Sequence, residues 1–397
     1  MTPSPSRSRD RGIALGLAVL LALSLLLPGA LAAQVPDQAQ PPAAPPAASP
    51  AAKFGEEVEV TEVFLDVLAL DRHGRTVPGL TKDDFEITED GRPVEVTSVD
   101  YYTTRYEDLG RAAAPRAREG AQAAPASVPS SRYFILFFHD QSGAVSNEAA
   151  LTRARLDAAR WARQWVRDDM QGSDWVAVVR YVQSLSVLSD FTQNQQAILQ
   201  AIDDAVVGRP SEITRPSVRR REEARGGPSL LAGLPDSFDL AGSATRPEDA
   251  VRLVAEASGK IIGRKNLLLY SLGFGQIGSA YRLGDSRYYP PMEEALNANN
   301  VAVYPIDLSG GGIHSDTGQT TFLSQLADDT GGELFKSFNS YLQPLEKISA
   351  QTTGYYLVTF RAKHKAGETG YQKIDVRVKR RGVQVRTRSG YRYGGKR

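Results

Sequence analysis

The chain has 397 residues, of which 41% are hydrophobic and 23% are charged, so it can form a packed core and is long enough for two domains. Its formal net charge is +1, which gives no general attraction to nucleic acid or to an anionic membrane surface. It contains no cysteine, which excludes disulfide bonds, thiolate metal sites, cysteine nucleophiles and a lipid anchor on an N-terminal cysteine.

Residues 1–33 have the pattern of a secretory signal peptide. Three arginines within residues 7–11 precede an apolar run from Ile13 to Leu27, and an A-x-A pattern follows at Ala30–Ala32. The run is shorter than the roughly 20 residues that a membrane span needs, although an uncleaved N-terminal anchor is the alternative. The sequence therefore predicts an exported protein that is periplasmic, surface-bound or secreted, with no transmembrane segment in the mature chain.

A proline- and alanine-rich linker is expected over residues 34–53, and a second linker over residues 107–130. Between them, residues 54–106 favour strands. The stretch "VEVTEVFLDVLAL", residues 58–70, is rich in β-branched and aliphatic residues, and Asp90–Gly91 predicts a hairpin turn. One hairpin and one strand bury too little apolar surface to be stable alone, so this segment needs strands from elsewhere in the chain.

Residues 131–353 show strands and helices in alternation. The run "YFILFF" from Tyr133 to Phe138 is continuously apolar, which is typical of a strand covered on both faces. Apolar residues then recur at helical spacing from Leu151 to Trp165, and further strands and helices follow. This order predicts an α/β fold with a doubly wound, mostly parallel sheet. A polar insert over about residues 208–240 is expected to be flexible.

Two helix starts within this region resemble capping boxes. Thr192 stands three residues before Gln195, and Thr245 stands three residues before Glu248. Pro247 lies at an early position of the second helix, where proline is favoured. Each pair is therefore expected to begin a helix.

Residues 354–397 again favour strands. Ile374, Val376 and Val378 alternate with charged residues, so one face of this strand is expected to contact solvent. These strands could supply what the N-terminal β segment lacks. We expect the two segments to form one small sandwich-like all-β domain, with the α/β region inserted between them or joined to them.

Several stretches in this order carry a family resemblance: "VFLDVLALDRHGRTVPGLTKDDFEITEDG", "YFILFFHDQSG", "LSDFTQNQQAILQAI", "GRKNLLLYSLGFG", "VAVYPIDLSG" and "VQVRTRSGY". The α/β region resembles a von Willebrand factor type A domain, which has a Rossmann-like fold. The chain from about Val58 to Tyr393 resembles the von Willebrand factor A-related proteins abundant in Acidobacteria. Each stretch alone is weak, and their joint presence in this order carries the resemblance.

The resemblance implies a metal-ion-dependent adhesion site, which in this family uses a D-x-S-x-S loop after the first strand. Asp140 and Ser142 match that loop, but its third position is Ala144, which has no oxygen ligand. The family's threonine corresponds to Thr245 or Ser243. The family's later aspartate corresponds to Leu272.

Asp140, Ser142 and Thr245 thus form a degenerate ligand set for Mg²⁺ or Ca²⁺, which prefer several oxygen ligands. We expect binding of either cation to be weak at most, and we expect no other cofactor. Without a metal, Asp140 and Ser142 would shape the loop or cap a helix.

The resemblance further implies a binding module rather than an enzyme. Its partner-binding face would lie at the carboxyl ends of the strands and would include His139, Asp140, Ser142, Gly273 and Asp307. The expected partner is an unknown protein or envelope ligand, and not nucleic acid. Two alternatives stay open: a secreted hydrolase using Asp140 and Ser142, and a structural component of the envelope.

Overall fold

The computed structural model describes residues 58–104, 127–129, 131–141, 148–211, 219–220, 224, 226–274, 287–309, 317–336, 340–365 and 367–394. The chain divides into two units, Met1–Gly55 and Glu56–Arg397, and all described residues belong to the second unit. The expected signal peptide, the first linker and Ser142 lie outside the described residues.

The α/β region is built on one five-stranded sheet with the order β10-β9-β6-β7-β8. Neighbouring strands are parallel except for β8, which runs antiparallel to β7. The mostly parallel sheet expected from the sequence is therefore confirmed. The strands are β6 (Arg132–His139), β7 (Asp174–Tyr181), β8 (Leu185–Thr192), β9 (Lys265–Ser271) and β10 (Val301–Asp307).

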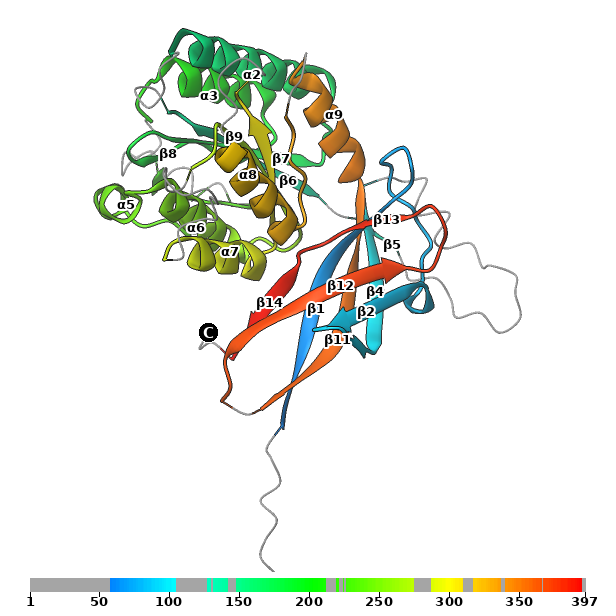
Figure 1. Ribbon diagram of the computed structural model, residues 1–397. Coiled ribbons are helices and arrows are strands. Elements are labelled where there is room, and N and C mark those ends of the chain that lie inside the picture. Colours follow the sequence, from blue (N-terminus) through cyan, green and yellow to red (C-terminus); the bar gives the residue numbers. More distant parts are fainter. Residues whose placement is uncertain are drawn as a thin grey trace, which may run out of the picture. The chain divides into compact units, whose positions relative to one another are not determined.

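Helices cover both faces of this sheet, as expected for a doubly wound fold (Figure 1). Alternate residues of β6 explain this: Phe134 and Leu136 enter one apolar core, and Ile135 and Phe137 enter the other. The first core contains side chains of α2 (Glu148–Asp168), α3 (Gln195–Val207) and α9 (Leu342–Gln351). The second contains side chains of α5 (Ser237–Ser243), α6 (Pro247–Ala257), α7 (Tyr289–Ala298) and α8 (Thr317–Thr330).

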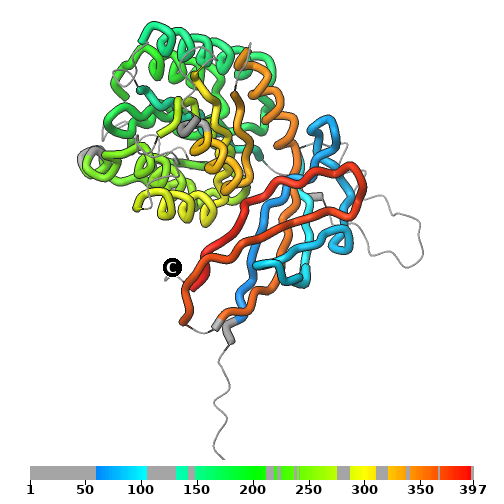
Figure 2. The backbone as a smooth tube through the Cα atoms, in the orientation of Figure 1, coloured from blue at the N-terminus to red at the C-terminus, as the bar shows by residue number. Residues whose placement is uncertain are grey.

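The strands before and after the α/β region form two further sheets with the orders β13-β1-β11-β4-β5 and β14-β12-β2-β3. Most pairings in these sheets are antiparallel, and their apolar faces share one core that includes Leu65, Phe85 and Tyr356. Figure 2 shows the C-terminal strands beside the first strand of the chain. The expected joining of the two terminal β segments is confirmed.

The strands of these two sheets have the following bounds: β1 (Val58–Leu70), β2 (Phe85–Glu89), β3 (Arg92–Val94), β4 (Val96–Thr103), β5 (Ser127–Pro129), β11 (Gly354–Lys365), β12 (Gly370–Val378), β13 (Gln384–Arg386) and β14 (Gly390–Tyr393). Short 3-10 helices lie at Lys82–Asp84 and Ser258–Lys260. The turn between β2 and β3 has positive φ at Asp90 (46°) and Gly91 (77°), which confirms the predicted hairpin.

Both predicted capping boxes are wrong. The first residue before α3 is Asn194, whose side chain accepts hydrogen bonds from the backbone of Gln196 and Ala197. The residue before α6 is Arg246, and α6 starts with Pro247. Thr245 is exposed and lies one residue outside the cap. The proline sets the start of α6 because its missing N–H is not needed there.

The second expected linker and the insert expected to be flexible both contain ordered structure. Residues Ser127–Pro129, placed in the linker 107–130, pair with β4 as the short strand β5. The insert expected to be flexible over about 208–240 contains four leucines buried in the core, at positions 230, 231, 234 and 240. Asp190 holds this part of the insert, because its carboxylate accepts hydrogen bonds from the Leu230 backbone (2.7 Å) and the Ser229 hydroxyl (2.5 Å). Hydrophobic periodicity in the sequence does not predict such long-range hydrogen bonds.

Candidate functional site

The parallel strands bring residues that are distant in sequence to one edge of the sheet. His139 ends β6, Ser271 ends β9 and Asp307 ends β10, and these three strands are neighbours in the sheet. The carboxyl ends of parallel strands meet at one edge, which is where open α/β sheets bind ligands. Four of the five residues of the expected partner-binding face follow these strand ends: His139, Asp140, Gly273 and Asp307.

The Asp140 carboxylate is held by two arginines. Arg155 of α2 donates to its Oδ1 at 2.7 Å and to its Oδ2 at 2.9 Å, and Arg180 of β7 donates to Oδ2 at 3.1 Å. The side chains are 7% exposed for Asp140, 11% for Arg155 and 17% for Arg180. Arg155 also lies 3.5 Å from the carbonyl of Val206, in the last turn of α3, where the helix dipole favours a cation. We call these three residues the Asp140 arginine cluster.

A second polar network joins β6 to β9. His139 Nδ1 lies 2.9 Å from Ser271 Oγ, which accepts the backbone N–H of Gly273 at 2.9 Å. The Gln141 side chain donates to the Gly273 carbonyl at 2.8 Å and accepts the N–H of Leu272 at 2.8 Å. Gly273 has a φ of +98°, which strongly favours glycine at this turn. The network therefore fixes the path of the chain after β9.

The His139 ring is buried between Tyr181 and Phe274, with ring centroids 5.6 Å from each. Burial lowers the pKa of His139 to about 4, although the Asp140 charge acts in the opposite direction. In the folded protein the imidazole is therefore neutral at neutral pH.

His139 should make stability depend on pH. Its folded-state pKa is depressed, so its contribution is full above the unfolded value of 6.5 and is lost as pH falls towards about 4. From these two values, the histidine should cost about 2 kcal/mol of unfolding free energy at about pH 5 relative to about pH 7. Denaturant unfolding at both pH values should show this loss in the parent and not in His139→Gln. The exposed His73 serves as control, since His73→Gln should keep the parent's pH dependence. An unchanged dependence in His139→Gln would contradict the assignment.

Asp307 closes its own turn. Its two carboxylate oxygens accept the backbone N–H and the hydroxyl of Ser309, both at 2.8 Å, and the side chain is buried. Asp307 therefore shapes the loop after β10 at the predicted face.

Thr245 is exposed in the loop before α6. Burial, and then the charges of Glu248 and Asp249 in the first turn of α6, raise the pKa of Tyr181, the last residue of β7, to about 12. No described contact joins Thr245 to Asp140, although the position of Ser142 is outside the described residues. Among the described residues, no two members of the expected ligand set are in contact.

The described residues do not fit a divalent cation at Asp140. Its two carboxylate oxygens, which would be the ligands, accept hydrogen bonds from two guanidinium groups whose positive charges would repel a cation. Leu272, where the family's aspartate would stand, is 5% exposed and packs in an apolar core with Phe138 and Tyr270. Within the described ranges, no three histidine or acidic side chains gather to hold a metal ion.

The sequence reasoning missed Arg155 and Arg180, although both left a signal. Arg155 is four residues after Leu151 and thus continues the apolar stripe of α2. Arg180 interrupts the apolar run from Val176 to Tyr181 in β7. Charged residues are seldom buried unless paired, so an arginine at such a position predicts a buried partner. The pattern could not identify that partner as Asp140.

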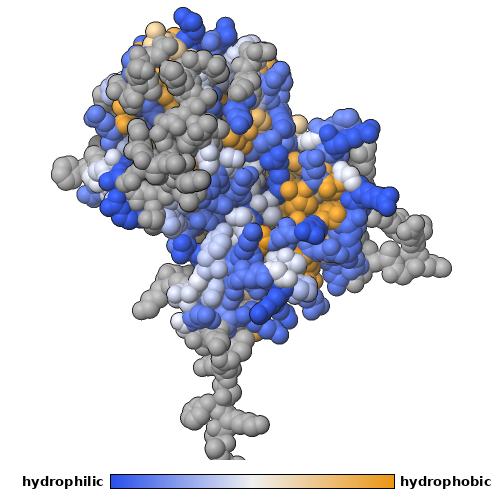
Figure 3. Space-filling view, viewed as in Figure 1, coloured by the Kyte–Doolittle hydropathy of each residue, from blue (hydrophilic) through white to orange (hydrophobic). Residues whose placement is uncertain are grey.

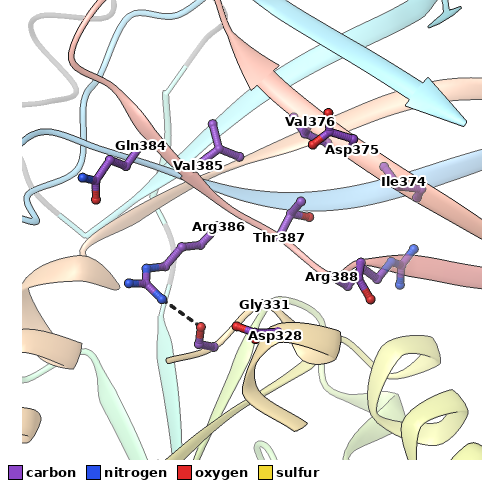
Figure 4. A pocket seen from close by; sticks show the side chains of 12 residues that line it. Asp328, Gly331, Ile374, Asp375, Val376, Gln384, Val385, Arg386, Thr387 and Arg388 are labelled. Atoms are coloured by element: carbon purple, nitrogen blue, oxygen red, sulfur yellow. Dashed lines mark hydrogen bonds between the residues drawn. The ribbon is translucent and has the colours of Figure 1, made fainter. Parts of the chain in front are cut away.

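A cavity of about 530 Å³ lies away from these residues, where α8 ends beside β12, β13 and the segment leading to β14 (Figure 4). Arg386 in its wall donates to the carbonyl of Gly332 at 3.0 Å, and Arg388 donates to the carbonyl of Asn297 at 2.7 Å. Figure 3 shows hydrophobic side chains at the surface over the strands of the terminal sheets, with hydrophilic ones around them. The residues that line this cavity belong to α8, β12, β13 and the segments next to them. None of the residues expected at the site is among them.

No protein-family model matches the chain, and no curated protein matches it. Among solved structures, it is similar to proximal thread matrix protein 1 from the mussel byssus, at 17% identity and a TM-score of 0.33 over 56% of this chain and 47% of that chain. Protein BatB from Bacteroides thetaiotaomicron is similar at 12% identity and a TM-score of 0.33, over 56% and 99% of the chains. The SpRpn10 VWA domain is similar at 10% identity and a TM-score of 0.30, over 55% and 95%.

The chain spans about half the length of the mussel protein that it matches, 47%. These likenesses are remote, and the α/β fold class rests on the sheet order and helix layers of the chain itself. Among the described residues, no helix combines the length and apolar character needed to cross a bilayer.

Proposed function

We propose that this chain is an exported binding module of the von Willebrand A type. The loops that follow β6, β9 and β10 bind a protein or another component of the cell envelope. The observation that carries the proposal is the strand-end edge, where His139, Asp140, Gly273 and Asp307 come from three neighbouring strands. Loops held by a rigid sheet suit recognition, since the scaffold keeps their positions fixed before the partner arrives.

The same edge gives little support to the alternative of a hydrolase. That alternative uses Asp140 and Ser142, and Ser142 lies outside the described residues. The described serine nearest to His139 is Ser271, at 2.9 Å, and its side chain is fully buried, so it does not replace Ser142 as an accessible nucleophile. Both oxygens of the Asp140 carboxylate accept hydrogen bonds from arginines, so in this arrangement neither oxygen is directed at a water molecule or a hydroxyl nucleophile. These two observations favour binding over hydrolysis.

The metal site expected from the resemblance is degenerate in this proposal. Arginine charge at Asp140 takes the place of a cation, so the module recognises its partner without Mg²⁺ or Ca²⁺. The signal peptide predicted over residues 1–33 supports export to the periplasm, the cell surface or the medium.

Site-directed photo-crosslinking tests the proposed face. A photoreactive amino acid at Thr245, which is exposed in the loop before α6 and which the resemblance assigns to the same site, should give a discrete crosslinked product in the native cell envelope. The same amino acid at Glu86, exposed on β2, is the matched control and should not give that product. Excess unlabelled mature protein should compete the product away. Equal products from both positions, or none from Thr245, would contradict the proposal.

A further inference from the structure

β12 and the chain that follows it form a hairpin whose two sides separate. At its open end, residues 370–373 of β12 pair with β14, whereas β13, which is nearer the turn, pairs with β1. The cavity of about 530 Å³ lies in the resulting gap, with β12 residues on one side and Val385 on the other (Figure 4). This volume is within the range of about 300 to 1,000 Å³ that is usual for ligand pockets. The gap is therefore large enough to hold a ligand.

On the β12 side, main-chain hydrogen-bonding groups point into the gap. Residues 374–378 of β12 pair with β2, and β14 lies at the opposite edge of β12. Ile374 donates its N–H to the carbonyl of Ser389 at 2.8 Å, so its main-chain groups face that opposite edge. Because these groups alternate between the two edges of a strand, those of Val376 face the same way. Within the described part of the chain, no strand pairs with Val376 at this edge.

On the β13 side, Val385 also directs its main-chain groups into the gap. β13 stands at the end of its sheet, next to β1. Val385 lies opposite Ala69, whose carbonyl accepts the N–H of Val77 on the other side of β1 at 2.9 Å. Ala69 and Val385 are therefore a non-hydrogen-bonded pair of the antiparallel ladder, which turns the Val385 N–H and C=O away from β1. Among the described strands, none pairs with Val385 on that side.

The side chains around the gap suit a peptide of alternating character. Ile374 and Val376 belong to the apolar core of the terminal sheets, and Val385 packs against that core. The Thr387 hydroxyl oxygen is buried, and within the described residues it has no hydrogen-bond partner. A strand places alternate side chains on opposite faces, so the apolar ones of an inserted strand would meet the core and the polar ones would face the other way.

From this geometry we propose that the gap between β12 and β13 binds a short extended segment of a partner protein, which adds a strand between them. Main-chain hydrogen bonds to both sides supply affinity, and alternate apolar side chains supply specificity. A peptide is favoured over a small molecule because a main chain repeats donors and acceptors along both of its edges. The open edge of β12, residues 374–378, accommodates about five residues at about 3.4 Å each.

This inference goes beyond the proposed function and does not depend on it. The cavity contains none of the residues of the strand-end edge. The gap is therefore a second binding surface, on the terminal sheets.

The test is a fluorescence anisotropy titration of the mature protein with a short labelled peptide in which threonine and valine alternate, with a lysine at each end for solubility. Saturable binding is expected. The same peptide with N-methylated valines is the matched control, because it keeps the charge and the side chains and loses the valine N–H donors. N-methylation should weaken binding by about tenfold or more, since each methyl group removes one main-chain hydrogen bond.

Two variants of Val385 test the protein side of the same hydrogen bonds. Val385→Pro removes the N–H that faces the gap, and proline is tolerated at an edge whose N–H is not used in the ladder. It should weaken peptide binding by about tenfold. Val385→Ala keeps the N–H and loses apolar contact, so it should weaken binding less than Val385→Pro. Thermal melts show whether both variants are folded, and the N-methylated peptide tests these bonds without any change to the protein.

A photoreactive group on the peptide locates the site by mass spectrometry, and crosslinks are expected to residues of β12 or β13. Crosslinks elsewhere, no peptide binding, equal binding of the N-methylated peptide, or unchanged binding by folded Val385→Pro would each overturn the inference. A dimer that forms without peptide and is lost in Val385→Pro would overturn it as well, because a second copy of the chain would then fill the gap.

Discussion

Asp174→Ala is expected to lower the free energy of unfolding by about 3 to 5 kcal/mol, because it leaves the Arg132 charge buried without a counter-charge. Arg132 donates to both oxygens of Asp174 at 2.6 Å, and the two side chains are 2% and 0% exposed. Arg132 also donates to the carbonyl of Ser349 at 2.8 Å. The pair thus links β6, β7 and α9 at the amino end of the sheet.

Guanidinium chloride unfolding followed by circular dichroism measures this loss. Asp375→Ala is the control, because the Asp375 carboxylate pairs with Arg377 at the surface, where the side chains are 54% and 76% exposed. Its removal should change the unfolding free energy by less than about 1 kcal/mol. A similarly small loss in Asp174→Ala would show that Arg132 finds another partner or water, and the burial argument would then be wrong.

Asp140→Ala is expected to lower the free energy of unfolding by about 2 kcal/mol, since it removes the carboxylate between Arg155 and Arg180. The value is below that for Asp174 because the two arginines are 11% and 17% exposed, so water can solvate part of their charge. The sign of the effect is informative. Removing a carboxylate from an empty cation site would relieve its repulsion with the other ligands of that site. Removing a carboxylate that pairs with two arginines destabilises the fold instead.

Calorimetric titration of Mg²⁺ and Ca²⁺ into the parent and Asp140→Ala completes this test. Neither protein should bind either cation with micromolar affinity, and Mg²⁺ should leave the thermal midpoint of both unchanged. Asp157→Ala is the control on α2, because Asp157 pairs at the surface with Arg160 at 3.1 Å. Micromolar affinity in the parent that disappears in Asp140→Ala would show a metal site and would refute the arginine assignment.

Local patterns in the sequence predicted most of the α/β layers. The continuous apolar run of β6 indicates a strand covered on both faces, because each face must meet a helix layer. The Asp90–Gly91 turn followed directly from residues that tolerate positive φ. The incomplete strand sets at both ends of the chain correctly indicated that they pair, since neither segment could cover its own apolar face.

Helix starts were predicted less well. The pairs Thr192–Gln195 and Thr245–Glu248 fit the capping-box spacing, yet α3 begins after Asn194 and α6 begins after Arg246. Several residues near a helix start can cap it, and the side-chain oxygen that reaches a free backbone N–H decides between them. The capping-box spacing therefore does not show which side chain makes that hydrogen bond.

The sequence by itself determined the fold class, which follows from hydrophobic period and turn chemistry, and these are local properties. The mismatch of Ala144 and Leu272 with a cation site came from the family resemblance, because only the resemblance assigns ligand roles to those positions. Only the tertiary structure decided that Asp140 is paired with Arg155 and Arg180, which are 15 and 40 residues away. That pairing depends on the rotation of α2 and on the parallel register of β6 with β7, which arise only when the helices pack on the sheet.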